Sequence, residues 1–160
     1  MAFRSMALVF AVAGGLAACG QPSPQAPQES SAPQSLTQAS PWASLAADVT
    51  VSPQPDGSVV IAASNTAPGY QVDYTVATNG AAAIRLRYDI TLQGGPGFIG
   101  VLAGDGSRWL NNFDLPANQR SQGDALVPLS GDAVRIVIQT GPTSARDSRF
   151  TVHSVEYALQ

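Results

Sequence analysis

The sequence contains no lysine, one cysteine and one histidine among its 160 residues. All basic residues are arginine, and the 8 arginines stand against 11 acidic residues, giving a formal net charge of -3. Nucleic-acid binding needs clustered Lys or Arg to displace phosphate counterions, so a weakly acidic chain without a basic cluster argues against it. A single cysteine forms no internal disulfide, and a single histidine does not supply a transition-metal ligand set. We therefore predict no metal and no cofactor.

The first 18 residues have the pattern of a secretory signal peptide. Arg4 and the amino terminus supply positive charge ahead of an apolar stretch at residues 6–13. This stretch is shorter than the ~20 apolar residues that a membrane-spanning helix needs. It ends at Leu16-Ala17-Ala18-Cys19, which is followed by Gly20.

The tetrapeptide 16–19 matches the lipobox of bacterial lipoproteins at all four positions, so the first twenty residues of the chain resemble that family. The resemblance implies cleavage before Cys19, lipidation of its thiol and acylation of its new amino group. Two or more acyl chains are what stable anchoring requires. Gly20, in place of the Asp that retains such proteins at the inner membrane, implies the outer membrane of the cell envelope. The alternative is an ordinary signal peptide with a chance cysteine.

Residues 19–41 form a Pro-, Gln- and Ser-rich segment that we predict to be a disordered tether. It carries almost no large apolar side chains, so it lacks the material for a core. Proline favours extended segments of about 3 Å per residue, which gives this segment a reach of at most roughly 60 Å. We place the start of the folded domain at Trp42 and its end at residue 160.

From residue 42 onward, apolar residues recur at a period of two and turn signals interrupt them, as in an all-β domain. In the stretch 84–92, Ile, Leu and Tyr alternate with Arg, Asp and Thr, which predicts a strand with one buried and one solvated face. Near the C-terminus the apolar phase flips around His153-Ser154, which predicts a β-bulge. The expected fold is an antiparallel β-sandwich of about nine strands. These strands cover residues 47–52, 58–64, 70–78, 83–93, 97–103, 107–112, 124–129, 133–140 and 148–159.

The order of these strands resembles the galactose-binding-like jelly rolls and related carbohydrate-binding modules. The segments that carry the resemblance lie at 69–76, 84–90, 97–102, 105–110, 134–138 and 148–157. The likeness covers residues 47–160 and rests on strand rhythm. It implies a jelly-roll topology and a glycan ligand.

Residues 105–112 form one candidate binding surface. Trp109 offers a ring on which a sugar can stack, and Asn111 and Asn112 offer hydrogen bonds to sugar hydroxyls, the combination that carbohydrate sites use. The alternative is that Asp105-Gly106 simply turns a hairpin and that Trp109 belongs to the core.

A second candidate is the polar stripe of Arg85, Arg87 and Asp89, with Arg135 added if its strand lies in the same sheet. Arginines on such a face bind hydroxyls or an acidic glycan, because a guanidinium grips a carboxylate with two hydrogen bonds. The alternative is a solvated face whose ion pairs add little stability.

Catalytic and metal signals are weak. His153 lacks a second histidine or a nucleophile elbow around it, so we expect a structural or exposed side chain. Asp48, Asp56 and Asp147 lie outside any ligand-dense loop that would indicate calcium.

Three readings follow from these residues. The first is a lipid-anchored glycan-binding module, which is our main expectation, with the membrane and a glycan as partners. The second is an assembly lipoprotein that docks another envelope protein, and the third is a hydrolase of envelope polymer. We expect no enzyme activity.

Overall fold

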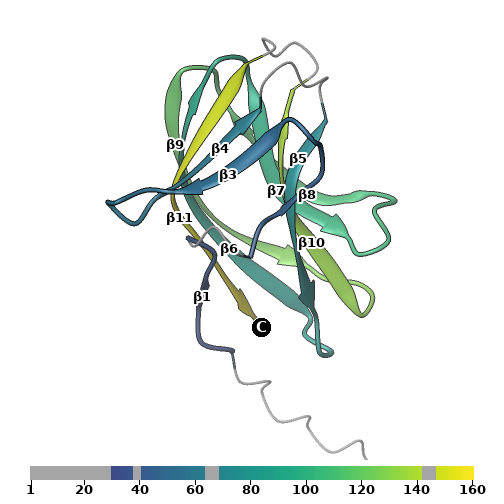
Figure 1. Cartoon of the computed structure of the whole chain (residues 1–160). Helices are drawn as coiled ribbons and strands as arrows, with labels where there is room; N and C mark the ends of the chain where they lie inside the picture. The colour runs from purple at the N-terminus through teal and green to yellow at the C-terminus, as the bar shows by residue number, and fades with distance from the viewer. Residues whose placement is uncertain (1–29, 38–40, 64–68, 142–146) are drawn as a thin grey trace, which may run out of the picture.

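The computed structural model describes residues 30–37, 41–63, 69–141 and 147–160. These residues form two antiparallel β-sheets that face each other (Figure 1), and no helix occurs among them. The predicted all-β sandwich is therefore confirmed. The predicted signal peptide, Cys19 and the first part of the tether lie outside the described residues. No helix within the described ranges is long and apolar enough to cross a membrane.

The first sheet, sheet A, has six strands in the order β3-β4-β11-β6-β9, with β1 also pairing with β11. Its strands are β1 (Gln34–Ser35), β3 (Val49–Pro53), β4 (Val59–Ala63), β6 (Ala83–Gln93), β9 (Gln119–Pro128) and β11 (Ser148–Leu159). The last strand of the chain thus lies near the middle of the sheet, between β4 and β6. This long-range pairing closes the sandwich.

The second sheet, sheet B, has five strands in the order β2-β5-β10-β7-β8. Its strands are β2 (Ala43–Ser44), β5 (Tyr70–Ala77), β7 (Gly97–Ala103), β8 (Trp109–Leu115) and β10 (Ala133–Thr140). Compared with our expectation, β8 runs three residues further at its C-terminal end and β9 begins five residues earlier. The two-residue strands β1 and β2 were not predicted.

The core fills the space between the sheets and follows the predicted alternation. On β6, the five side chains assigned to the buried face are at most 8% exposed: Ile84, Leu86, Tyr88, Ile90 and Leu92. Their counterparts on β10 are Val134, Ile136 and Ile138, all fully buried. Fully burying one such side chain stabilises the fold by about 1.5–3 kcal/mol, so these rows supply much of the driving force for folding.

The predicted bulge on β11 is confirmed. The pairing of β11 with β6 shifts register between Val152 and Ser154, which leaves His153 as the extra residue. Val152 before the bulge and Val155 after it are both fully buried. One extra residue therefore lets two apolar runs of opposite phase face the same core.

The N-terminal side of the domain differs from our expectation. The sequence predicts that residues 30–37 belong to a disordered tether, but in the structure they lie along the C-terminal half of β11. Gln34 stands opposite Tyr157, Leu36 donates its backbone N–H to Val155 at 2.7 Å, and the Leu36 side chain is 2% exposed. The indole of Trp42, itself 5% exposed, donates to the carbonyl of Leu36 at 2.8 Å. The folded unit therefore includes residues 30–37.

Candidate functional site

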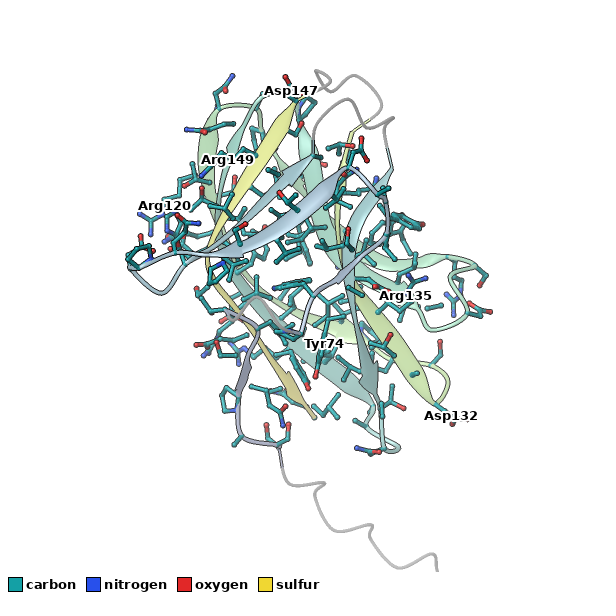
Figure 2. The ribbon with its side chains drawn as sticks, in the orientation of Figure 1. Tyr74, Arg120, Asp132, Arg135, Asp147 and Arg149 are labelled. Atoms are coloured by element: carbon teal, nitrogen blue, oxygen red, sulfur yellow. The ribbon has the colours of Figure 1, made fainter. Side chains whose placement is uncertain are left out.

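The predicted binding residues are divided between the two sheets of the sandwich. Arg85, Arg87 and Asp89 lie on β6 in sheet A, whereas Trp109, Asn111 and Asn112 lie on β8 in sheet B. Arg135, which we had grouped with the β6 stripe if the strands shared a sheet, lies on β10 and hence in sheet B. Figure 2 shows the consequence, since Arg120 of sheet A and Arg135 of sheet B lie on opposite sides of the molecule.

Trp109 belongs to the outer face of sheet B. It stands opposite Leu102 on β7, and because Val101 is in the core, its neighbours Gly100 and Leu102 face outward. The Cζ3 atom of Trp109 lies 2.9 Å from the place that a Cβ atom at residue 100 would take. Glycine at this position therefore leaves room for the indole ring to lie over the sheet.

Tyr70 on β5 completes an aromatic pair with Trp109. The two ring centroids are 5.8 Å apart and the ring planes are inclined at 85°, an edge-to-face arrangement. Both side chains are half-buried, and Phe98, also half-buried, shares this side of the sheet. We call the outer surface of sheet B with Tyr70, Phe98 and Trp109 the aromatic face. Trp109 is thus neither a core residue nor a fully exposed one.

Polar groups flank the aromatic pair. Arg135 stands opposite Leu102, so it faces outward. Its Nε donates to Asp73 Oδ2, and its Nη2 forms an ion-pair contact with the same oxygen. The side chains of Arg135 and Asp73 are 22% and 9% exposed, which makes this ion pair the most buried of the described chain. Partial burial, the hydrogen bond and the ion-pair contact together hold both groups in a fixed orientation.

The two adjacent asparagines divide between the two sides of β8. Asn112 stands opposite Gly100 and so faces outward with the indole ring, whereas Asn111 stands opposite the core-facing Val101. Both are exposed because β8 is an edge strand. Strand alternation therefore brings Asn112, but not Asn111, onto the aromatic face.

The outer surface of sheet A is built from ion pairs, and we call its cluster of Arg85, Arg87, Asp89, Arg120 and Asp124 the charged face. Asp124 accepts hydrogen bonds from Arg85 Nε at 2.7 Å, Arg85 Nη2 at 2.9 Å and Arg87 Nε at 3.1 Å. These bonds, with that from Arg85 the strongest, lower the pKa of Asp124 to about 2.

Asp89 forms the other centre of the charged face. It accepts from Arg120 Nε at 2.7 Å, from Arg120 Nη2 at 2.6 Å and from Gln122 Nε2 at 2.7 Å. The bond from Arg120 is the main cause of its lowered pKa. The predicted stripe on β6 is therefore joined by partners from β9, at the edge of the sheet.

His153 shares a hydrogen bond with Thr91, with 2.9 Å between Nε2 and Oγ1. Because His153 is the bulged residue of β11, this bond ties the bulge to β6. Among the described residues, no group of three or more His, Cys, Asp or Glu side chains gathers as metal ligands would.

Sequence reasoning missed Tyr70, Asp73, Arg120 and Asp124. Asp73 could have been found from the sequence, because strand alternation places it on the side opposite the buried Val72, and hence on the outer face of the sheet. Tyr70 did not, because a register shift in the pairing of β5 with β10 turns it outward against the phase of the rest of the strand. The N-terminal half of β9 is polar throughout, so no periodicity indicated a strand there.

No family model and no curated protein matches this chain. Solved structures do match. One is the CBM36-1 domain of a multidomain xylanase from the hindgut metagenome of Trinervitermes trinervoides, at 8% identity and a TM-score of 0.54, with 81% of this chain and 98% of that chain covered. Another comprises the CBM22-1 and GH10 modules of xylanase 10B from Clostridium thermocellum, complexed with xylohexaose, at 10% identity and a TM-score of 0.54. That match covers 82% of this chain and 28% of that chain. The chain therefore shares the jelly-roll sandwich fold of carbohydrate-binding modules.

Proposed function

We propose that this protein is a glycan-binding module that uses the aromatic face of sheet B. A sugar ring stacks on the exposed part of the Trp109 and Tyr70 pair. Asn112 and the Arg135–Asp73 pair then bind ring hydroxyls, the amide as both donor and acceptor, the guanidinium as donor and the carboxylate as acceptor.

The observation that carries this proposal is the aromatic pair itself. Two half-buried rings 5.8 Å apart, with the indole held over Gly100, form a fixed apolar surface beside an oriented ion pair. Sugars present an apolar ring face and a rim of hydroxyls, and sites that bind them combine these two kinds of surface. The likeness in fold to carbohydrate-binding modules supports the same assignment.

We further propose that Cys19 carries the lipid that holds this module in the cell envelope, at the outer membrane. The lipobox match at residues 16–19 and the following Gly20 support this location. Mass spectrometry of the protein purified from a bacterial membrane fraction tests it. We expect an N-terminus at Cys19 with a mass increase equal to that of its acyl chains, and an unmodified N-terminus elsewhere would refute it.

The glycan assignment is tested by titrating the full chain with neutral xylo- and manno-oligosaccharides and measuring heat and tryptophan fluorescence. Trp42 is 5% exposed and serves as an internal reference, so a ligand on the aromatic face should change the emission of Trp109 alone. Trp109→Ala should weaken binding by about five- to 150-fold, since a stacking contact contributes about 1–3 kcal/mol by analogy with base stacking.

A matched pair of variants on β8 separates the two sides of the strand. Asn112→Ala should reduce affinity, whereas Asn111→Ala, its exposed neighbour of opposite orientation, should leave affinity unchanged. Equal effects of the two substitutions, or unaltered binding by Trp109→Ala, would place the glycan elsewhere and refute the proposal.

The docking alternative receives less support. It predicts a contiguous exposed apolar patch, and the large exposed hydrophobic residues of the described chain are Leu45, beside β2 of sheet B, and Leu126, on β9 of sheet A. The two therefore lie in different sheets. Arg120 and Asp124 also place charge on the edge strand β9, which disfavours strand addition there.

A further inference from the structure

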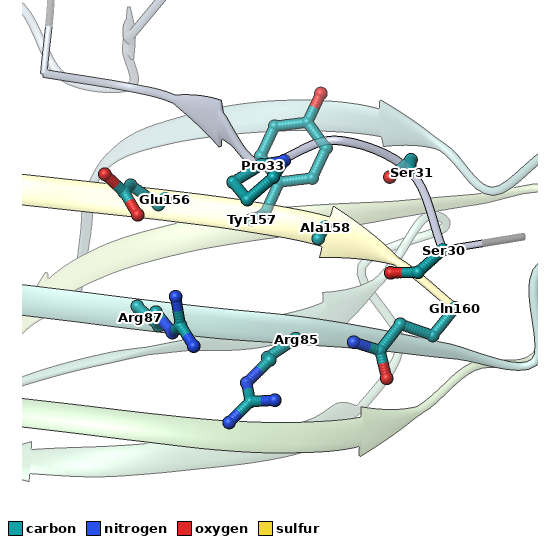
Figure 3. A pocket seen from close by; sticks show the side chains of 9 residues that line it. All are labelled: Ser30, Ser31, Pro33, Arg85, Arg87, Glu156, Tyr157, Ala158 and Gln160. Carbon is teal, nitrogen blue, oxygen red and sulfur yellow. The ribbon is translucent and has the colours of Figure 1, made fainter.

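A small cavity lies on the charged face, on the side of the sandwich opposite the proposed glycan surface. Its volume is about 140 Å³. Three segments line it: β6 with Arg85 and Arg87, the end of β11 with Glu156, and the N-terminal residues 30–33 (Figure 3). The pocket therefore exists because the N-terminal segment folds along β11 and supplies one of its walls.

The two arginines in this pocket share one carboxylate. Asp124 binds Arg85 through two nitrogens and Arg87 through Nε only, so the three side chains carry one net positive charge. Both terminal nitrogens of Arg87 make no hydrogen bond within the described part of the chain, and its side chain is 49% exposed. Asp124 thus holds the guanidinium groups in place and leaves the terminal nitrogens of Arg87, a residue that lines the pocket, without a partner among the described residues. Donors held in this way lose little conformational freedom when an anion binds.

Glu156 restricts which anion fits. It stands directly opposite Arg87 in the pairing of β11 with β6, and it forms no ion pair within the described residues. A doubly charged anion placed against Arg87 would be repelled by this carboxylate. A ligand with a single carboxylate and several hydroxyl groups satisfies both residues, because its carboxylate binds the arginines and a hydroxyl donates to Glu156.

We propose that this pocket binds a uronic acid residue, through a charge-assisted hydrogen bond from Arg87 and Arg85 to its carboxylate and a hydroxyl donated to Glu156. The pocket is a second ligand site, separate from the aromatic face. The full chain would thus bind a neutral stretch of glycan on one face and an acidic sugar on the other.

Calorimetric titration of the full chain with D-galacturonate tests this site, with methyl D-galacturonate ester and acetate as probes that lack the charge and the hydroxyls respectively. We expect galacturonate to bind at least tenfold more tightly than either, and its affinity to fall as salt increases because the contact is ionic. Arg87→Gln should weaken galacturonate binding about tenfold or more. Arg120→Gln, a matched change on the same face in the neighbouring ion pair, should leave it unchanged.

Three results would overturn the inference. They are equal binding of the ester, equal binding of acetate, and equal loss of affinity in Arg87→Gln and Arg120→Gln. Titrating each ligand into the variant of the other site distinguishes the two proposed sites. Trp109→Ala should retain galacturonate binding, and Arg87→Gln should retain binding of the neutral oligosaccharides, so failure of one site leaves the other open to test.

Discussion

The N-terminal segment gives the sharpest test of the fold. Leu36→Ala removes a side chain that is 2% exposed and belongs to the core cluster. Replacing a buried leucine by alanine costs about 2–4 kcal/mol, combining lost burial with the cavity that remains. For a domain of this size, one kcal/mol shifts the melting temperature by roughly 3–5 °C, so we expect a decrease of roughly 10 °C.

The measurement is chemical and thermal unfolding of the full chain, followed by circular dichroism. Leu45→Ala is the matched control, because it makes the same chemical change at a side chain that is 40% exposed. It should alter the free energy of unfolding by no more than about 0.5 kcal/mol. If the two variants proved equally stable, residues 30–37 would be a tether after all, and the extension of the domain beyond Trp42 would be refuted.

Three further predictions concern individual contacts. Gly123→Ala should destabilise the fold by about 1–3 kcal/mol in the same assay, because the added Cβ atom would lie 2.5 Å from Cζ of the buried Tyr88 ring. An unchanged unfolding midpoint would show that the ring moves aside at little cost. The pKa of Asp124 is lowered to about 2, so its ionised carboxylate stabilises the fold fully above about pH 4, and this stabilisation is lost as pH falls towards 2. Asp124→Asn should therefore flatten the acid limb of a profile of melting temperature against pH. An unaltered limb would count against the pairing with Arg85. Burial raises the pKa of Tyr157 to about 12, so its protonated hydroxyl stabilises the fold fully below about pH 10, and this stabilisation is lost between about pH 10 and 12. Tyr157→Phe should therefore flatten the alkaline limb of the melting-temperature profile. Parallel profiles of the two proteins would contradict the raised pKa.

The orientation of side chains was largely predictable from the sequence. Alternation along residues 84–92 identified the buried and the solvated side of β6, and the flip of phase near His153 identified the bulge. Both signals are local, since the pleat of a strand determines where each side chain points.

Strand pairing was less predictable, because it depends on contacts far apart in the chain. Nothing local indicates that β10 lies in the other sheet from β6, so the grouping of Arg135 with Arg85 had no sequence signal to correct it. The pairing of β1 with β11 rests mainly on backbone hydrogen bonds and on one leucine, and composition does not encode either. The partnership of Trp109 with Tyr70 likewise depends on a register shift that only the assembled sheet displays.

The attachment of residues 30–37 to β11 has a mechanical consequence. If Cys19 is the lipidated residue, eleven residues separate the anchor from Ser30, and their maximum reach is about 35 Å, compared with the roughly 60 Å predicted for a tether reaching residue 41. Tension on the anchor then enters the fold at Ser31, whose N–H donates to the carbonyl of Leu159 at 2.9 Å. The pull is therefore transmitted to β11, an interior strand of sheet A, rather than to a peripheral hairpin. With Cys19 as the anchor, the strand that closes the sandwich would also be the one that bears the load from the membrane.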